Sequence, residues 1–254
     1  MKNFLATAII IAITFSASLL AGTRDPSVPD EKYIEYGSKF HYVLSICGIY
    51  QDNTLFCASA VAISPRIILT AAHVVENSKH CGISINDSDV IIVDKVICHE
   101  DYDGEFGKAD IAICYLSKDL DFKFYPELYD KDDEVGKLCC ISGYGLTGTF
   151  KTGQSFSDGK KRAGSNTIDS IAKDLLICTP SKKTSLDRTS LEYIICSGDS
   201  GGGLFIDNKL AGINSCVMSI GKSPMSTYGD EAGHTRVSKF LQWILKNKEK
   251  LEKQ

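Results

Sequence analysis

The sequence lacks a dense block of basic residues outside its C-terminal tail, which argues against a nucleic-acid-binding surface. Its formal net charge is -4, from 28 Lys and Arg residues against 32 Asp and Glu residues. The ten cysteines lack the paired close spacing of zinc ribbons and fingers, and the acidic turns show no ordered calcium-ligand pattern. We therefore expect no nucleic-acid partner, no metal and no other cofactor.

A hydrophobic run long enough to cross a membrane is also missing from the N-terminus. The apolar run at residues 4–15 has the length of a signal-peptide core and follows a short segment with one positive charge, Lys2. Small residues follow at 16–18. We expect a signal peptide over residues 1–18, a secreted protein and no stable membrane association, with an uncleaved anchor as the alternative. An oxidising compartment would favour disulfides among the cysteines.

Sustained helical periodicity is absent before residue 236, although residues 168–175 are compatible with a short helix. Short apolar or alternating runs are instead separated by Gly, Asn, Asp and Ser, which predicts an all-β sandwich or barrels. The polar run at residues 129–134 is the best boundary between two halves. Apolar residues at helical spacing after residue 236 predict an amphipathic C-terminal helix.

The sequence does contain a glycine-rich turn, SGDSGGG at residues 197–203, that presents Ser200. A serine hydroxyl needs a base to take its proton, and small neighbours let backbone N–H groups approach the oxyanion that forms on attack. His73 is the candidate base because it lies in a small-residue turn directly after an apolar strand. Asp110 is the candidate partner of His73, since it leads straight into the apolar strand 111–116, where an unpaired carboxylate is costly.

Three motifs carry these residues in a fixed order: TAAH at 70–73, DIA at 110–112 and GDSGG at 198–202. Together they resemble the chymotrypsin-like (trypsin-fold) serine endopeptidases. The run SGYG at 142–145 and the segment 235–244 are similar to a strand and to the end of that family. The resemblance implies an all-β fold of two six-stranded antiparallel β-barrels, with the active site in the cleft between them and a C-terminal α-helix.

The resemblance covers nearly all of the chain that follows the signal peptide, and it sets the expected domain boundaries. These are a peptidase domain at 19–254, with an N-terminal barrel at about 30–128, a C-terminal barrel at about 129–236 and a helix at 237–252. The implied function is a secreted, monomeric serine endopeptidase that acts on polypeptides and can meet protein protease inhibitors. A catalytically inactive homologue acting as a binding module is the alternative, but such proteins typically lose the serine or the histidine. A cysteine-dependent or metal protein inside the cell is disfavoured by the signal peptide and the cysteine spacing.

The family's functional residues carry over to matching positions of this chain. Ser200 would be the nucleophile, His73 the general base and then acid, and Asp110 the residue that orients His73. The backbone N–H groups of Gly198 and Ser200 would form the oxyanion hole. Ser215 matches the position whose backbone pairs with a bound peptide as an added strand.

Asp199 would form an ion pair with the mature N-terminal amine. In the family that amine belongs to an apolar pair followed by two small residues, and the run LLAG at residues 19–22 has this form. We expect signal removal itself to expose Leu19 as the activating N-terminus, so that Leu19 pairs with Asp199. Cleavage after Ala21 or Gly22 is the alternative, and Asp199 would then need another partner.

The specificity pocket is also implied by position. Trypsin-like members carry an acidic residue at the pocket floor, where this chain has Ile194 with Ile195 beside it. Gly233 matches the glycine that keeps the pocket open. An apolar floor offers a Lys or Arg side chain no counter-charge, so we expect an apolar or small residue at P1, the position before the cleaved bond.

Six of the ten cysteines are assigned to expected pairs, namely Cys57 with Cys81, Cys98 with Cys114, and Cys196 with Cys216. The first two pairs flank His73 and Asp110, and the third is implied by the resemblance. The pairing of the other four stays open: Cys47, Cys139, Cys140 and Cys178. For the adjacent Cys139 and Cys140, one alternative is that one is bonded and the other is a buried free thiol.

Overall fold

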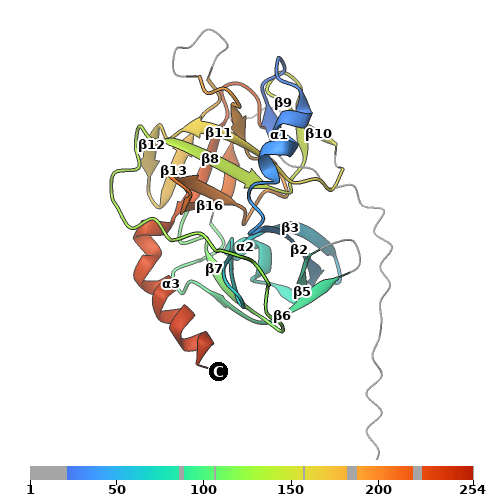
Figure 1. The fold of residues 1–254 in the computed structure, drawn as a ribbon, viewed down its shortest axis with the longest axis vertical. Helices are drawn as coiled ribbons and strands as arrows, with labels where there is room; N and C mark the ends of the chain where they lie inside the picture. The colour runs from blue at the N-terminus through green and yellow to red at the C-terminus, as the bar shows by residue number, and fades with distance from the viewer. Residues whose placement is uncertain are drawn as a thin grey trace, which may run out of the picture.

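The computed structural model describes residues 22–85, 89–105, 107–156, 158–181, 188–219 and 225–253. The predicted signal peptide and Leu19 lie outside the described residues. Figure 1 shows two β units, one above the other in the view, with the C-terminal helix running beside the lower one. The chain enters the upper unit first and then builds the lower one before it returns.

The structure has three helices and seventeen strands in the described residues. The helices are α1 (Asp30–Gly37), α2 (Ala72–Val75) and α3 (Val237–Glu252). The strands are β1 (Thr23–Arg24), β2 (Val43–Tyr50), β3 (Leu55–Ser64), β4 (Ile67–Thr70), β5 (Ser78–Ser84), β6 (Val90–Cys98), β7 (Ala112–Leu116), β8 (Leu138–Gly143), β9 (Thr147–Thr149), β10 (Gly153–Phe156), β11 (Arg162–Thr167), β12 (Ser170–Ala172), β13 (Leu175–Cys178), β14 (Tyr193–Ile194), β15 (Gly203–Ile206), β16 (Lys209–Met218) and β17 (Glu231–Arg236).

The first β unit is a closed barrel with the strand order β2-β3-β4-β7-β6-β5. Its strands are rich in Ile, Val and Ala, which suit a buried pleated surface. Strands β4 and β7 are neighbours, and Thr70 lies opposite Ala112 in their ladder. The segment that leaves β4 and the segment that enters β7 therefore meet at the same edge of the barrel.

The second β unit is a seven-stranded sheet with the order β11-β8-β15-β16-β17-β13-β12, beside a four-stranded sheet, β10-β9-β1-β14. Strands β15 and β16 are joined by a two-residue turn, in which Asp207 and Asn208 have φ of 49° and 64°. A type I′ hairpin turn needs positive φ at both central residues, and Asp and Asn tolerate it. This hairpin pairs β15, the strand that follows the glycine-rich turn, with β16.

The predicted all-β fold with a C-terminal helix is confirmed, and one local prediction was wrong. Residues 168–175 form no helix but lead through β12 into β13. Lys173 turns the chain with a φ of 54°, and Ile171 then pairs with Leu176. The reason lies in the tertiary structure. Strand β13 is fully buried and pairs with β17, so its apolar residues pack as part of a sheet rather than on one face of a helix.

The three expected cysteine pairs are also not formed. Cys57 bonds to Cys47, which lies directly opposite in the β2–β3 ladder, and the other eight cysteines are unbonded in this structure. Cys81 lies on β5, with β2 between it and β3, so Cys47 is the nearer partner of Cys57. Cys98 faces Ala112 rather than Cys114 in the β6–β7 register.

Helix α3 is amphipathic, as predicted, and it joins the two units. It follows β17 directly, and its buried Phe240, Ile244 and Leu251 belong to the core of the first barrel. Trp243 packs partly against the same core, and its indole N–H donates to the Glu100 carboxylate at 2.9 Å. Helix α3 thus holds β17, the last strand of the second unit, in place against the first barrel.

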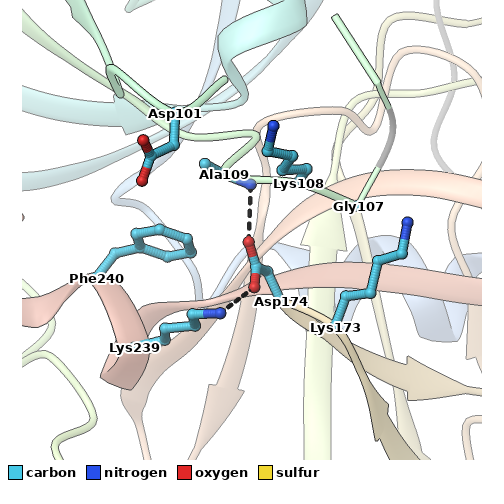
Figure 2. Close-up of a pocket in the computed structure, with 8 residues that line it drawn as sticks. All are labelled: Asp101, Gly107, Lys108, Ala109, Lys173, Asp174, Lys239 and Phe240. Carbon is cyan, nitrogen blue, oxygen red and sulfur yellow. Dashed lines mark hydrogen bonds and ion pairs between the residues drawn. The ribbon is translucent and has the colours of Figure 1, made fainter. Parts of the chain in front are cut away.

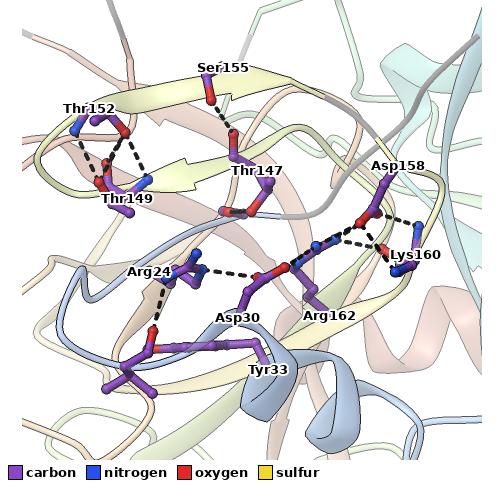
Figure 3. Close-up of polar contacts among 12 residues, drawn as sticks. Arg24, Asp30, Tyr33, Thr147, Thr149, Thr152, Ser155, Asp158, Lys160 and Arg162 are labelled. Carbon is purple, nitrogen blue, oxygen red and sulfur yellow. Dashed lines mark hydrogen bonds and ion pairs between the residues drawn. The ribbon is translucent and has the colours of Figure 1, made fainter.

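A buried arginine fixes the N-terminal segment. Figure 3 shows Arg162 between Asp30 and Asp158, with Arg24 on the other side of Asp30. Arg162 Nε donates to Asp30 Oδ1 at 2.8 Å, and its two Nη atoms donate to Asp158 at 3.0 Å each. Arg24 Nε donates to Asp30 Oδ1 at 3.0 Å. Burial alone would raise the pKa of Asp30, but the arginines outweigh burial and lower it.

We predict that Arg162→Met lowers the free energy of unfolding by about 3 kcal/mol, because it removes the buried cation between Asp30 and Asp158 and leaves Asp30 with Arg24 alone. Urea denaturation followed by circular dichroism measures the change. The matched control is Lys248→Met, which removes a surface pair with Glu252 and should cost about 0.5 kcal/mol or less. Equal losses in the two variants would show that the Arg162 network does not hold the segment.

Candidate active site

His73 and Asp110 lie side by side at the edge of the first barrel. His73 is in α2, directly after β4, and Asp110 stands two residues before β7. The His73 Nδ1 atom lies 2.8 Å from Asp110 Oδ2, and the His73 backbone N–H donates to Asp110 Oδ1 at 3.0 Å. Since the carboxylate accepts, Nδ1 carries the proton and Nε2 is left as the basic nitrogen.

The second β unit holds Asp110 from the other side. Ser215 in β16 donates its hydroxyl to Asp110 Oδ2 at 2.6 Å, and Thr235 in β17 donates to the Asp110 carbonyl oxygen at 2.9 Å. The carboxyl is fully buried. Burial alone would raise its pKa, but the hydrogen bonds from His73 and Ser215 outweigh that effect and lower the pKa. The carboxylate is therefore ionised at neutral pH.

Ser200 lies in the turn between β14 and β15, and the structure brings it to the same place. Its Oγ donates to the backbone carbonyl of Ser215 at 3.5 Å, while the Ser215 hydroxyl contacts Asp110. Ser215 thus links the Ser200 turn to the His73–Asp110 pair. The residues that the sequence motifs single out, far apart in the chain, converge at the junction of the two β units.

The turn also presents two backbone N–H groups. Gly198 has a φ of 90°, in the region that favours glycine. Within the described part of the chain, neither the Gly198 N–H nor the Ser200 N–H donates to another group. Backbone N–H groups without an acceptor in the protein can donate to an oxyanion.

Asp199, between these two residues, points away from them into the second unit. Its fully buried carboxylate accepts N–H bonds of 2.8 Å each from Gly22, Gly145 and Cys196. A Cβ on Gly143 would lie 2.4 Å from Asp199 Oδ1, and one on Gly145 would lie 2.6 Å from its Cγ. The two glycines of the SGYG run are therefore what leaves room for this carboxylate. Burial raises its pKa to about 7, although the three N–H groups favour the ionised form.

The residues expected to form the specificity pocket are buried. Ile194 and Ile195 belong to the core of the second unit. Gly233 lies opposite Cys216 in the β16–β17 ladder, next to the Ser215 backbone. A Cβ on Gly233 would lie 3.1 Å from Cys216 Sγ and 2.7 Å from a methyl group of Leu175. Glycine is therefore the residue that fits between these side chains.

Sequence reasoning missed Ser59, which ties the Ser200 turn to the first barrel. The Ser59 N–H donates to the Ser200 carbonyl at 2.9 Å, and its hydroxyl donates to the Gly198 carbonyl at 3.0 Å. The same hydroxyl accepts the Tyr144 N–H, and Thr70 donates to the Ser59 carbonyl. The available signal was a serine inside the otherwise apolar run of β3.

Sequence reasoning also missed the pair of Asn214 and His234 behind the turn. The Asn214 side-chain amide donates to the carbonyls of Ser142 and Asp199 at 3.1 Å each. Its Oδ1 therefore accepts from Nδ1 of His234 at 2.9 Å. Burial lowers the pKa of His234 to about 3, so this imidazole is neutral. The pair braces the carbonyl of Asp199.

A surface pocket of about 360 Å³ lies beside the segment that carries Asp110. Figure 2 shows Asp174 between Ala109 and Lys239 in this pocket. Asp174 Oδ2 accepts the Ala109 N–H at 3.0 Å, and its other oxygen pairs with Lys239. Because Ala109 directly precedes Asp110, this contact helps to fix the chain on which Asp110 stands.

Comparison with known proteins places this chain in a family. The family model described as Trypsin matches residues 41–244. The chain belongs to the trypsin family. Curated trypsin-family relatives include kallikrein-4 of Homo sapiens, 24% identical over 214 residues (78% of this chain and 80% of that protein), and chymotrypsin of Phaedon cochleariae, 28% identical over 213 residues (76% and 72%).

Solved structures support the same fold. HL collagenase superposes with a TM-score of 0.68 at 18% identity, over 84% of this chain and 95% of that chain. Neuropsin, a serine protease of mouse brain, superposes with a TM-score of 0.64 at 21% identity, over 83% and 96%. Among the described residues, no helix is long and apolar enough to span a membrane, and no group of three or more His, Cys, Asp or Glu side chains could hold a metal ion.

Proposed function

We propose that this trypsin-family chain is an active, secreted serine endopeptidase that cleaves peptide bonds with Ser200, His73 and Asp110. The observation that carries the proposal is the buried Asp110 carboxylate, which accepts from His73 on one side and from Ser215 on the other. A carboxylate in this setting orients the imidazole and stabilises its charged form. Inactive homologues typically lose the serine or the histidine, and this chain keeps both Ser200 and His73.

The proposed reaction follows from these positions. Ser200 Oγ attacks the carbonyl carbon of the substrate while His73 Nε2 takes its proton. The N–H groups of Gly198 and Ser200 stabilise the oxyanion, and His73 then gives the proton to the leaving amine. Water hydrolyses the acyl-enzyme by the same steps in reverse. The Ser215 carbonyl would accept from the substrate backbone.

We predict that a fluorophosphonate probe labels the protein and that Ser200→Ala abolishes labelling, because the probe forms a bond only with an activated serine. His73→Ala and Asp110→Asn should each lower kcat/KM for a peptide substrate by a factor of about 10,000. The matched control is Ser197→Ala, an exposed serine three residues away, which should keep full labelling. Labelling that survives Ser200→Ala would refute the assignment.

The P1 preference depends on what lies at the pocket floor. Ile194 and Ile195 are buried in an apolar cluster. The carboxylate just before them, Glu192, accepts from the backbone N–H groups of Ser181 and Thr189 at 2.8 Å each. The Glu192 carboxylate is therefore already hydrogen-bonded to Ser181 and Thr189 rather than directed at a substrate cation. These contacts support a pocket that takes apolar or small side chains.

We predict that phenylalanyl or alanyl peptide substrates are cleaved at least about tenfold faster than the matched arginyl substrate, because the arginine charge would be desolvated without a partner. A fluorogenic series that differs only at P1 measures the ratio of kcat/KM values. Faster cleavage of the arginyl substrate would overturn the proposed preference.

The N-terminal segment supports a specific mature terminus. The Gly22 N–H reaches Asp199, and the Gly22 carbonyl accepts from Thr147 at 3.0 Å. Thr23, the next residue, pairs with Ile194 in β14 and Gly148 in β9. Residues 22–24 are thus already docked in the second unit, with the Gly22 nitrogen against a buried carboxylate.

The space around Gly22 admits no side chain. Gly22 has a φ of 52°, and a Cβ there would lie 2.0 Å from the ring of Tyr193. The buried Tyr193 ring therefore occupies the volume that the apolar first residue would need in the pattern expected from sequence. Leu19, the terminus expected from that pattern, lies outside the described residues.

We therefore propose that removal of the signal peptide after Ala21 leaves Gly22 as the first residue and activates the enzyme without a separate propeptide. The new ammonium group would favour the ionised Asp199 and lower its pKa.

N-terminal sequencing of the secreted, active protein should give a sequence that begins Gly-Thr-Arg. A start at Leu19 in active enzyme would refute the proposed terminus. Gly22→Val should lower activity by about tenfold or more through its clash with Tyr193, and Tyr193→Ala should restore activity in the double variant.

A further inference from the structure

Two buried thiols face each other in the core of the second unit. Cys139 Sγ and Cys178 Sγ lie 3.8 Å apart, and both residues are fully buried. Cys139 comes from β8 and Cys178 is the last residue of β13. Two sulfurs this close need only a small rotation of their side chains to reach the bonding distance of about 2.05 Å.

A disulfide between these two cysteines would connect strands that are not neighbours in the sheet. In the seven-stranded sheet, β15, β16 and β17 separate β8 from β13. The first barrel is closed by hydrogen bonds, whereas this sheet has two ends. A bond between Cys139 and Cys178 would join the two sides of the sheet across its core and close a loop that includes β11 and β12.

We propose that Cys139 and Cys178 form a disulfide in the secreted protein and that Cys140 remains a free thiol. Each cysteine loses its thiol hydrogen and one S–S bond forms. The oxidant is the disulfide of a thiol–disulfide oxidoreductase, which leaves with two thiols after two exchange steps. This bond needs an oxidising compartment but does not depend on the proposed peptidase activity.

Cys140 supplies the contrast because it is adjacent in sequence and points to the other face of β8. Successive side chains of a strand alternate between the two faces. The Cys140 sulfur lies 2.7 Å from the hydroxyl of Tyr36 in α1, away from Cys178. Cys139 lies in the core of the second unit, whereas Cys140 packs against the core of the first barrel.

The timing of bond formation follows from burial. The neighbouring thiol and burial both raise the pKa of Cys178, and exchange requires a thiolate. The bond must therefore form while the sheet is still open during folding. Once formed, it lies out of reach of a reductant in the native protein.

Peptide mapping of the secreted full-length protein tests the proposal. The protein is alkylated in denaturant and digested with trypsin without reduction. The peptide 138–151 should then be linked to the peptide 174–182. The link should persist in Cys140→Ala and vanish in Cys139→Ala. Alkylation of both Cys139 and Cys178, or a link that needs Cys140, would overturn the proposal. Fluorophosphonate labelling of the same sample reports the peptidase function separately.

Thermal unfolding distinguishes a disulfide between Cys139 and Cys178 from two unbonded thiols that only pack together. Cys139→Ala and Cys178→Ala should each lower Tm by about 5–10 °C, and the double variant should lose little more, because one bond is lost in all three. Losses that add in the double variant would indicate two independent packing defects and no bond. Dithiothreitol should lower Tm only if the protein is first unfolded in its presence; a loss without unfolding would contradict the buried disulfide.

Discussion

The desolvation of one carboxylate, Asp110, is the constraint on which the rest of the site depends. A buried charge of this kind is tolerated only with several hydrogen bonds, and the partners come from both β units. His73 belongs to the first barrel, whereas Ser215 and Thr235 belong to the second unit. The charge is therefore stabilised only when the two units are docked, which couples assembly of the fold to assembly of the site.

A second buried carboxylate, that of Asp199, has a different electrostatic environment. Asp110 is surrounded by donors that lower its pKa, whereas burial raises that of Asp199 to about 7. Backbone N–H groups alone do not compensate Asp199 fully, which leaves it in need of a cation. The two carboxylates thus divide the tasks: one orients the histidine, and the other ties the conformation of the Ser200 turn to the N-terminal segment.

Much of this could be read from sequence where the information is local. The strand–turn pattern gave the all-β class, and the motifs around His73, Asp110 and Ser200 identified residues that the structure brings to one place. The sequence does not show which residues of neighbouring strands lie opposite each other. The prediction therefore pairs Cys57 with Cys81, whereas the structure pairs it with Cys47. Ser59 was missed for a different reason, because its contacts with the Ser200 turn form only when the two β units dock.

The N-terminus depends on two distant positions, Gly22 and Tyr193, that compensate each other. The family pattern pointed to an apolar first residue, and the run LLAG offered one at Leu19. In the structure the Tyr193 ring fills the corresponding space from β14, which leaves room only for glycine at position 22. Neither Gly22 nor Tyr193 is informative alone, since a glycine and a buried tyrosine are common. Their meaning depends on a contact across 171 positions of the chain, which only the fold creates.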